Sequence, residues 1–154
     1  KKGVCIGDAF IETENIIWAA GNAATPLIEH VTAHTHKMGM ALVNKDFSIQ
    51  EDDKIFCVGD CAYLELSSGQ PVPSVAQGAL QGGHFVAKQI LRDLKGKPRQ
   101  CFQYKDKGKM ATIGRSRAVA ELPFMRFSGF IAWFLWCVIH IWFLIDFRKV
   151  TNLT

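Results

Sequence analysis

The segment that most restricts the fold of this chain is an apolar run near its C-terminal end. From Phe130 to Ile145 only His140 interrupts 15 apolar residues, which predicts a helix over Ser128–Phe147. Sixteen residues of helix are roughly 24 Å long, shorter than the about 30 Å hydrocarbon core of a bilayer. We therefore expect a helix that lies in a membrane interface rather than one that spans it. A helix buried in a protein core is the alternative.

The side chains in and around this helix are typical of membrane contact. Three of the four tryptophans of the chain lie in it, and basic residues flank it. Tryptophan favours the headgroup region of a bilayer. The candidate membrane residues are Arg126, Trp133, Trp136, Trp142 and Arg148.

The charge of the chain is divided unevenly. Residues 1–94 carry 7 basic and 11 acidic side chains, whereas residues 95–154 carry 11 basic and 3 acidic ones. The second part therefore has a net charge of +8, and we expect an anionic lipid surface as its partner. Nucleic acid is not an expected partner, because no RNP-type motif, zinc-finger spacing or helix-turn-helix signature is present.

Short strand patterns alternate with helical ones over residues 1–95, which predicts an α/β fold. The expected strands are Gly3–Ile6, Asn15–Ala20, Met40–Val43 and Lys54–Val58, with further short strands over residues 101–121. The expected helices are Pro26–His36 and a longer one that begins after the N-cap Ser74 and ends near Lys95.

The stretch KIFCVGDCAYL, residues 54–64, contains a candidate ligand site. An apolar strand that ends in Gly59–Asp60 presents a carboxylate at the sheet edge where open α/β sheets bind ligands. Gly59 has no Cβ and permits close approach, and the Asp60 carboxylate suits hydrogen bonds from sugar hydroxyls. The alternative is that Asp60 only caps the following turn.

Cysteine and histidine clusters give weaker signals. The chain has five cysteines and no C-x-x-C spacing, so we expect neither a disulfide framework nor a metal site. Cys57 is expected to be a small buried apolar residue. His30 and His34 could share a helix face and bind a metal, but solvated histidines are the simpler interpretation.

Five segments resemble type II NADH dehydrogenases, in the order that family has them. DKIFCVGDCA resembles the second flavin-binding motif of the two-dinucleotide-domain flavoprotein disulfide reductase superfamily, and VPSVAQGALQGG resembles the A-Q-x-x-x-Q motif of the type II enzymes. IIWAAGNAATPL is similar to the segment that closes the NADH domain. Tyr104–Arg115 resembles a segment beneath the flavin, and the apolar helix resembles the anchoring helix of the family.

The resemblance implies the C-terminal part of a two-dinucleotide-binding-domain, Rossmann-like flavoprotein, followed by a membrane-anchoring helix. The implied parts are 1–44, the end of the NADH-binding domain; 45–100, the C-terminal part of the FAD-binding domain; 101–126, short strands at the flavin and quinone side; and 127–154, the anchoring helix and a clipped tail. Both G-x-G-x-x-G fingerprints of the family are absent from this chain and are expected before Lys1.

The resemblance also assigns site residues. FAD would be held by Gly59, Asp60, Ala76 and Gln77; Ala20 and Gly21 would lie on the NADH side; the quinone would meet Gln77, Gln81, Met110 and Arg115. The backbone at Ala76–Gln77, at the start of a helix, would steady negative charge on a reduced flavin.

The implied function is that of a FAD-dependent oxidoreductase that passes electrons from NADH to a membrane quinone without pumping protons. Such a protein is peripheral (monotopic) on the cytoplasmic face of the bacterial inner membrane, and a homodimer is compatible with it. Without the fingerprints, the isolated chain is not expected to be active. Two alternatives stay open: a sulfide:quinone-type flavoprotein, because Cys61 could approach a flavin, and a non-catalytic membrane-bound remnant.

Overall fold

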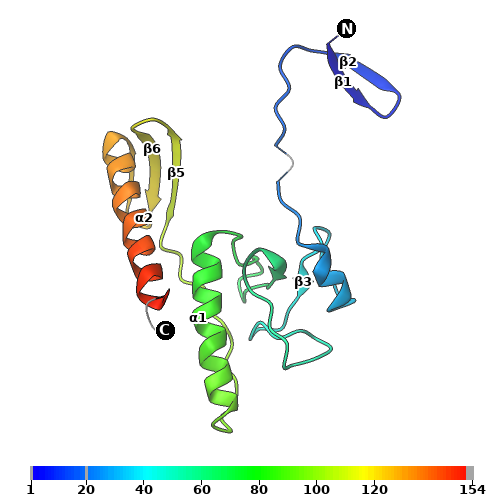
Figure 1. The fold of residues 1–154 in the computed structure, drawn as a ribbon, viewed down its shortest axis with the longest axis vertical. Helices are drawn as coiled ribbons and strands as arrows, with labels where there is room; N and C mark the ends of the chain where they lie inside the picture. The colour runs from blue at the N-terminus through cyan, green and yellow to red at the C-terminus, as the bar shows by residue number, and fades with distance from the viewer. Residues whose placement is uncertain (1, 20, 152–154) are drawn as a thin grey trace. The chain divides into compact units, whose positions relative to one another are not determined.

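The computed structural model of the chain describes residues 2–19 and 21–151, with the side chains of 143–151 outside the described part. The chain divides into two units, Lys1–Tyr104 and Lys105–Thr154. Helices mix with small sheets in the described residues (Figure 1), which fits the predicted α/β class. The assignment of residues to NADH-binding, FAD-binding and anchoring parts stays a prediction.

The first unit contains two small sheets. Strands β1 (Gly3–Ile6) and β2 (Ala9–Glu12) form an antiparallel hairpin, and β3 (Ala41–Leu42) and β4 (Ala62–Tyr63) form a parallel pair. The parallel pair is short, with Ala41 opposite Ala62. The remaining elements of the first unit are the 3-10 helices η1 (Pro26–His30) and η2 (Gly59–Cys61) and the helix α1 (Ala76–Asp93).

Three expectations near the N-terminal end need correction. Asn15–Ala19 forms no strand, although one was predicted, and Ala20 lies outside the described residues. Strand β2 was not predicted. The helix expected over Pro26–His36 ends at His30, because the chain turns there: the Thr32 hydroxyl donates to the Glu51 carboxylate at 2.8 Å, and the Ala33 N–H donates to it at 3.0 Å.

The strand predicted over Lys54–Val58 is also wrong. Within that stretch only Phe56 forms a bridge, an antiparallel one to Ser48. The reason is that the segment folds back on the loop before it: the Cys57 N–H donates to the Phe47 carbonyl at 3.0 Å. These backbone groups are therefore satisfied locally rather than by a parallel neighbour.

Helix α1 begins one residue later than predicted. Its N-cap is Val75 instead of Ser74, because the Val75 N–H donates to the Pro73 carbonyl at 2.8 Å and leaves Val75 extended. The helix packs its apolar side on a cluster of aromatic rings. Phe47, Phe85 and Phe102 meet edge to face, with centroids 4.8 to 6.3 Å apart. This cluster is the centre of the first unit's core.

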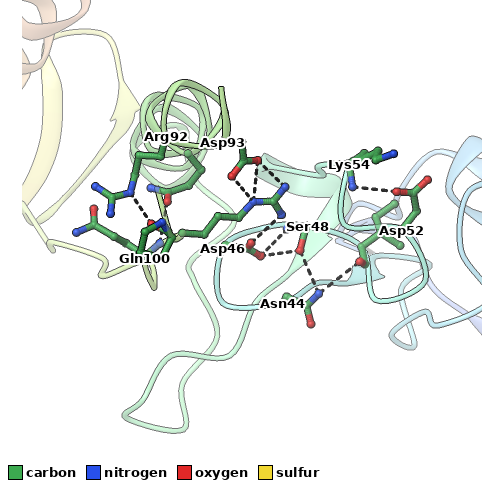
Figure 2. A network of polar contacts seen from close by, with 12 residues as sticks. Asn44, Asp46, Ser48, Asp52, Lys54, Arg92, Asp93 and Gln100 are labelled. Carbon is green, nitrogen blue, oxygen red and sulfur yellow. Dashed lines mark hydrogen bonds and ion pairs between the residues drawn. The ribbon is translucent and has the colours of Figure 1, made fainter. Parts of the chain in front are cut away.

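A polar network fixes the segment after α1 to the loop that carries Phe47 (Figure 2). Arg99 donates to the Asp93 carboxylate at 2.6 Å and to the Asp46 carboxylate at 3.1 Å. The Ser48 hydroxyl donates to Asp46 at 2.6 Å. Burial alone would raise the pKa of Asp46, but these hydrogen bonds from Ser48 and Arg99 outweigh it and hold that pKa below its ordinary value.

The second unit is a three-stranded antiparallel sheet with one helix against it. Strands β5 (Lys109–Gly114), β6 (Arg117–Leu122) and β7 (Met125–Gly129) follow in that order, and α2 (Phe130–Thr151) packs on the sheet (Figure 1). Ala118 and Ala120 of β6 and Ala132 of α2 are buried at the contact.

Helix α2 starts two residues later than predicted. Ser128 and Gly129 still belong to β7, where they lie opposite Val119 and Ala118 of β6. Among the described residues, no helix combines enough length and apolar character to cross a bilayer.

The Asp46 network predicts a pH-dependent contribution to stability. Because folding lowers the pKa of Asp46, its contribution is present above the ordinary value of 3.8 and is lost as the pH falls through the lower folded value. We expect Asp46→Asn to lower the free energy of unfolding by about 2 kcal/mol at pH 7, since charge-assisted hydrogen bonds are lost. The difference from the unsubstituted protein should shrink below about pH 4.

Urea unfolding at pH 7 and pH 3 measures this effect, with Asp53→Asn as the control. Asp53 is an exposed carboxylate of the same loop, and its substitution should change stability by less than about 0.5 kcal/mol. An Asp46 effect of equal size at both pH values would contradict the role of its charge.

Candidate functional site

The Gly-Asp turn forms η2 and lies against the first two turns of α1. Gly59 has φ +76°, a conformation that side chains with a Cβ rarely adopt. A Cβ at Gly59 would also lie 3.3 Å from the Cβ of Ala79 on α1. Glycine is thus required twice here, once for the backbone angle and once for the close approach of the turn to the helix.

Two glycines of α1 allow close approach to two other segments, the loop before the helix and the loop that carries Phe47. A Cβ at Gly78 would collide with the carbonyl oxygen of Pro73, and a Cβ at Gly82 would lie 3.1 Å from the Phe47 ring. The two positions are four residues apart and lie on one helix face. The start of α1 is therefore fixed by backbone contact to both the loop before it and the Gly-Asp turn.

The turn and the helix start present complementary polar groups. Asp60 is exposed, so its carboxylate is open to a ligand. Among the described residues no side chain caps the start of α1, which leaves the positive end of the helix and its first N–H groups available. Buried Oε1 of Gln77 has no hydrogen-bond partner in the described part of the chain. A buried acceptor without a partner is costly, and it marks a place where a donor is expected.

Gln77 and Gln81 follow each other on one side of α1, one turn apart, and both are half-buried. The structure thus brings η2, which contains Gly59 and Asp60, into contact with α1, the helix that carries Ala76, Gln77 and Gln81. Their roles toward FAD and quinone remain predictions.

Sequence reasoning considered Cys57 and Cys61 separately and did not predict that their sulfurs meet at the same turn. The Sγ atoms of Cys57 and Cys61 are 2.8 Å apart, and Cys61 Sγ donates to the Val58 carbonyl at 3.2 Å. Cys57 is buried, as predicted, and burial together with the contact to Cys61 raises its pKa to about 12. The signal that could have revealed the pair is its position, one cysteine on each side of Gly59–Asp60.

The histidines do not gather. His36 stacks on Tyr63 with a ring centroid distance of 4.2 Å, and its buried Nδ1 lacks a hydrogen-bond partner in the described residues. His34 lies 3.7 Å from the Glu51 carboxylate, and His30 ends η1. In the part of the chain that the structure describes, no three metal-ligating side chains converge.

Gly21, one of the two predicted NADH-side residues, lies in the irregular segment before η1. Gly21 is exposed with φ +74°, and Ala20 lies outside the described residues. Trp18 nearby is 89% exposed. In the described residues this segment does not pack into the core. The prediction that it lies on the NADH side therefore rests on the sequence pattern alone.

Met110 and Arg115 lie at opposite ends of β5. Met110 packs with Ala118, Ala120 and Phe127 on the α2 side of the sheet, whereas Arg115 is exposed in the turn between β5 and β6. Four residues of strand lie between them, and the five residue steps correspond to roughly 17 Å. The structure does not bring these two predicted quinone residues together. Met110 lines an open pocket of about 560 Å³. The charged side chains of Lys109, Glu121 and Arg126 also line this pocket.

The predicted membrane residues differ in their surroundings. Arg126 lies on β7 and pairs with Glu121, while Trp136 stacks on His140 at 3.8 Å. Trp142 is exposed, and Arg148 lies in α2 with its side chain outside the described part. Helix α2 also carries a stripe of exposed apolar side chains that points away from its sheet. The stripe consists of Phe130, Ile131, Phe134, Val138, Ile141 and Trp142.

The close packing of α1 predicts opposite effects for two neighbouring glycines. Gly78→Ala should destabilise the protein by about 1–3 kcal/mol, because its Cβ meets a backbone oxygen that must move. Gly83→Ala adds a Cβ with nothing within 4 Å and should stabilise the helix by about 0.5–1 kcal/mol. Thermal unfolding of the two variants measures the difference. Equal stabilisation by both would show that α1 is not in backbone contact at Gly78.

No protein-family model matches the chain. Among curated proteins, the type II NADH:quinone oxidoreductase Ndh of Mycobacterium tuberculosis is 42% identical over 93% of this chain and 32% of its own length. NdhA of the same organism is 34% identical over 96% of this chain and 33% of its own length. The type II NADH:quinone oxidoreductase of Staphylococcus saprophyticus is 33% identical over 68% of this chain and 26% of its own length. The chain is therefore a homologue of the type II NADH:quinone oxidoreductases, as its motifs predicted, and spans about a third of the length of the curated relatives it matches.

Proposed function

We propose that this chain is the C-terminal part of a FAD-dependent NADH:quinone oxidoreductase that does not pump protons. The observation that carries the proposal is the contact of the Gly59–Asp60 turn with the start of α1, where Gln77 Oε1 is buried without a partner in the described residues. Homology to proteins named type II NADH:quinone oxidoreductase supports it.

The residues at the turn fit a flavin dinucleotide. The exposed Asp60 carboxylate can accept hydrogen bonds from the ribityl hydroxyls, and Gly59 lets the cofactor approach the backbone. The uncapped start of α1, at Ala76–Gln77, offers N–H groups and positive partial charge to the electron-rich edge of the ring. FAD itself, when bound, supplies the two-electron chemistry between NADH and quinone.

The glutamines of α1 would border the quinone. The carboxamide oxygen of Gln77 lacks a donor among the described residues, and Gln81 lies one turn further on the same side of α1. Met110 and Arg115 would lie on the quinone side, and Ala20 and Gly21 on the NADH side. These assignments follow the motifs.

NADH is favoured over sulfide as the electron donor. The relatives reported above all carry names that state NADH:quinone oxidoreductase, whereas the sulfide alternative rested on Cys61 alone. The names of these relatives also favour an oxidoreductase over a non-catalytic remnant.

The second unit would attach the protein to the membrane without crossing it. The exposed apolar stripe of α2 lies away from its own sheet, and the unit is rich in basic residues. Such a combination binds the interface of anionic bilayers. We place the protein on the cytoplasmic face of the bacterial inner membrane, as a monotopic protein in which a homodimer is compatible with the fold.

Replacement of Asp60 in the complete protein tests the function. We expect Asp60→Ala to weaken FAD binding about 10- to 100-fold, because charge-assisted hydrogen bonds to the cofactor are lost. Flavin absorbance after gel filtration, and NADH:quinone reductase activity with and without added FAD, measure this effect. The Asp53→Ala variant is the control, since Asp53 is exposed outside the turn. Full FAD retention by Asp60→Ala would contradict the assignment.

The membrane assignment predicts a loss of vesicle binding. The double variant Phe134→Ser and Ile141→Ser should bind vesicles that contain phosphatidylglycerol at least about tenfold more weakly, because two apolar side chains no longer enter the interface. Cosedimentation measures binding, and added salt should weaken it. Leu94→Ser is the control, because Leu94 is 79% exposed in the first unit. Equal binding by all three proteins would rule out the stripe as the contact surface.

A further inference from the structure

The two sulfur atoms at the Gly-Asp turn are close enough to bond. Cys57 Sγ and Cys61 Sγ are 2.8 Å apart, and a disulfide bond is about 2.0 Å long, so an approach of only ~0.8 Å separates the two states. Both thiols are free in the structure. The other three cysteines, Cys5, Cys101 and Cys137, have no sulfur contact of this kind among the described residues.

The two thiols differ in their surroundings. Cys57 is buried in the core with Phe47 and Leu64 as fellow members, and its raised pKa keeps it a thiol. Cys61 is half-buried on η2, where a reagent from solvent can reach it. In such a pair, the accessible sulfur reacts with the oxidant to form a mixed disulfide. The second sulfur then attacks the first and expels the remaining part of the oxidant.

We propose that Cys57 and Cys61 form a reversible dithiol–disulfide site whose co-substrate is a small-molecule disulfide. The Cys61 thiol loses its proton to water, and its sulfur attacks one sulfur of the co-substrate, which expels the first small thiolate and leaves a mixed disulfide on Cys61. Cys57 then attacks Cys61 Sγ and expels the second thiolate, which takes the proton of Cys57. Two cysteine thiols are oxidised, and one small disulfide is reduced to two thiols.

The bond would close a ring around the Gly-Asp turn. Val58, Gly59 and Asp60 lie between the two cysteines, and Gly59 holds the positive φ that reverses the chain. In the dithiol state the turn is held by the Cys61–Val58 contact and the packing on Ala79. In the disulfide state its ends would be joined covalently.

Peptide mapping of the complete, folded protein tests the proposal. The protein is incubated with oxidised glutathione, quenched with acid, alkylated with iodoacetamide and digested without reductant. We expect the peptide that contains both cysteines to be unalkylated and lighter than the dithiol by two hydrogen atoms. Dithiothreitol should restore two alkylation sites. Cys101, which is exposed, should remain alkylated or carry glutathione, without an internal link.

Single variants separate the roles of the two sulfurs. Cys57→Ala suits the buried site, and in this variant glutathione should accumulate on Cys61, because nothing displaces it. In Cys61→Ala, Cys57 should react with glutathione at least tenfold more slowly than Cys101, because it is buried. Lasting glutathione on Cys61 of the unsubstituted protein, or two alkylated thiols after full oxidation of Cys101, would overturn the proposal.

Discussion

The first unit depends on the close approach of α1 to its neighbours. At Gly59, Gly78 and Gly82 a single Cβ would press on a helix, a carbonyl oxygen or an aromatic ring. These contacts hold the helix start beside the Gly-Asp turn and leave the helix free of a side-chain cap among the described residues. The candidate site thus combines the Asp60 and Gln77 side chains with backbone groups whose positions depend on glycines.

The sequence was sufficient for the features that arise from local chemistry. The helix over 76–93 follows from its apolar spacing, and the long C-terminal helix follows from its continuous apolar run. The Gly-Asp turn was identified through the family resemblance of its segment, since the glycine and carboxylate alone left a turn cap as the alternative. The turn and α1 carry consecutive motifs of the family, and the structure places the two in contact. The ligand roles of these residues remain proposals.

Other features depend on partners that a local pattern does not contain. Lys54–Val58 is as apolar as a buried strand, yet a strand needs a neighbour, and its backbone pairs with the preceding loop instead. Asn15–Ala19 likewise has a strand-like composition. It has no partner strand in the described part of the chain and therefore forms no strand. The contact between Cys57 and Cys61 was not predicted, because their spacing of four residues was compared only with the C-x-x-C motif. A turn can also bring together cysteines at other spacings.

The second unit separates two demands on one helix. Helix α2 meets its sheet through Ala132 against Ala118 and Ala120, and the larger side chains of Met110, Phe127 and Trp133 pack around these alanines. The exposed apolar residues of the stripe lie on the opposite side. Natural selection can therefore act on each side of α2 separately. The exposed residues can change in size and aromatic character without altering the contact of Ala132 with Ala118 and Ala120, and so without altering the sheet.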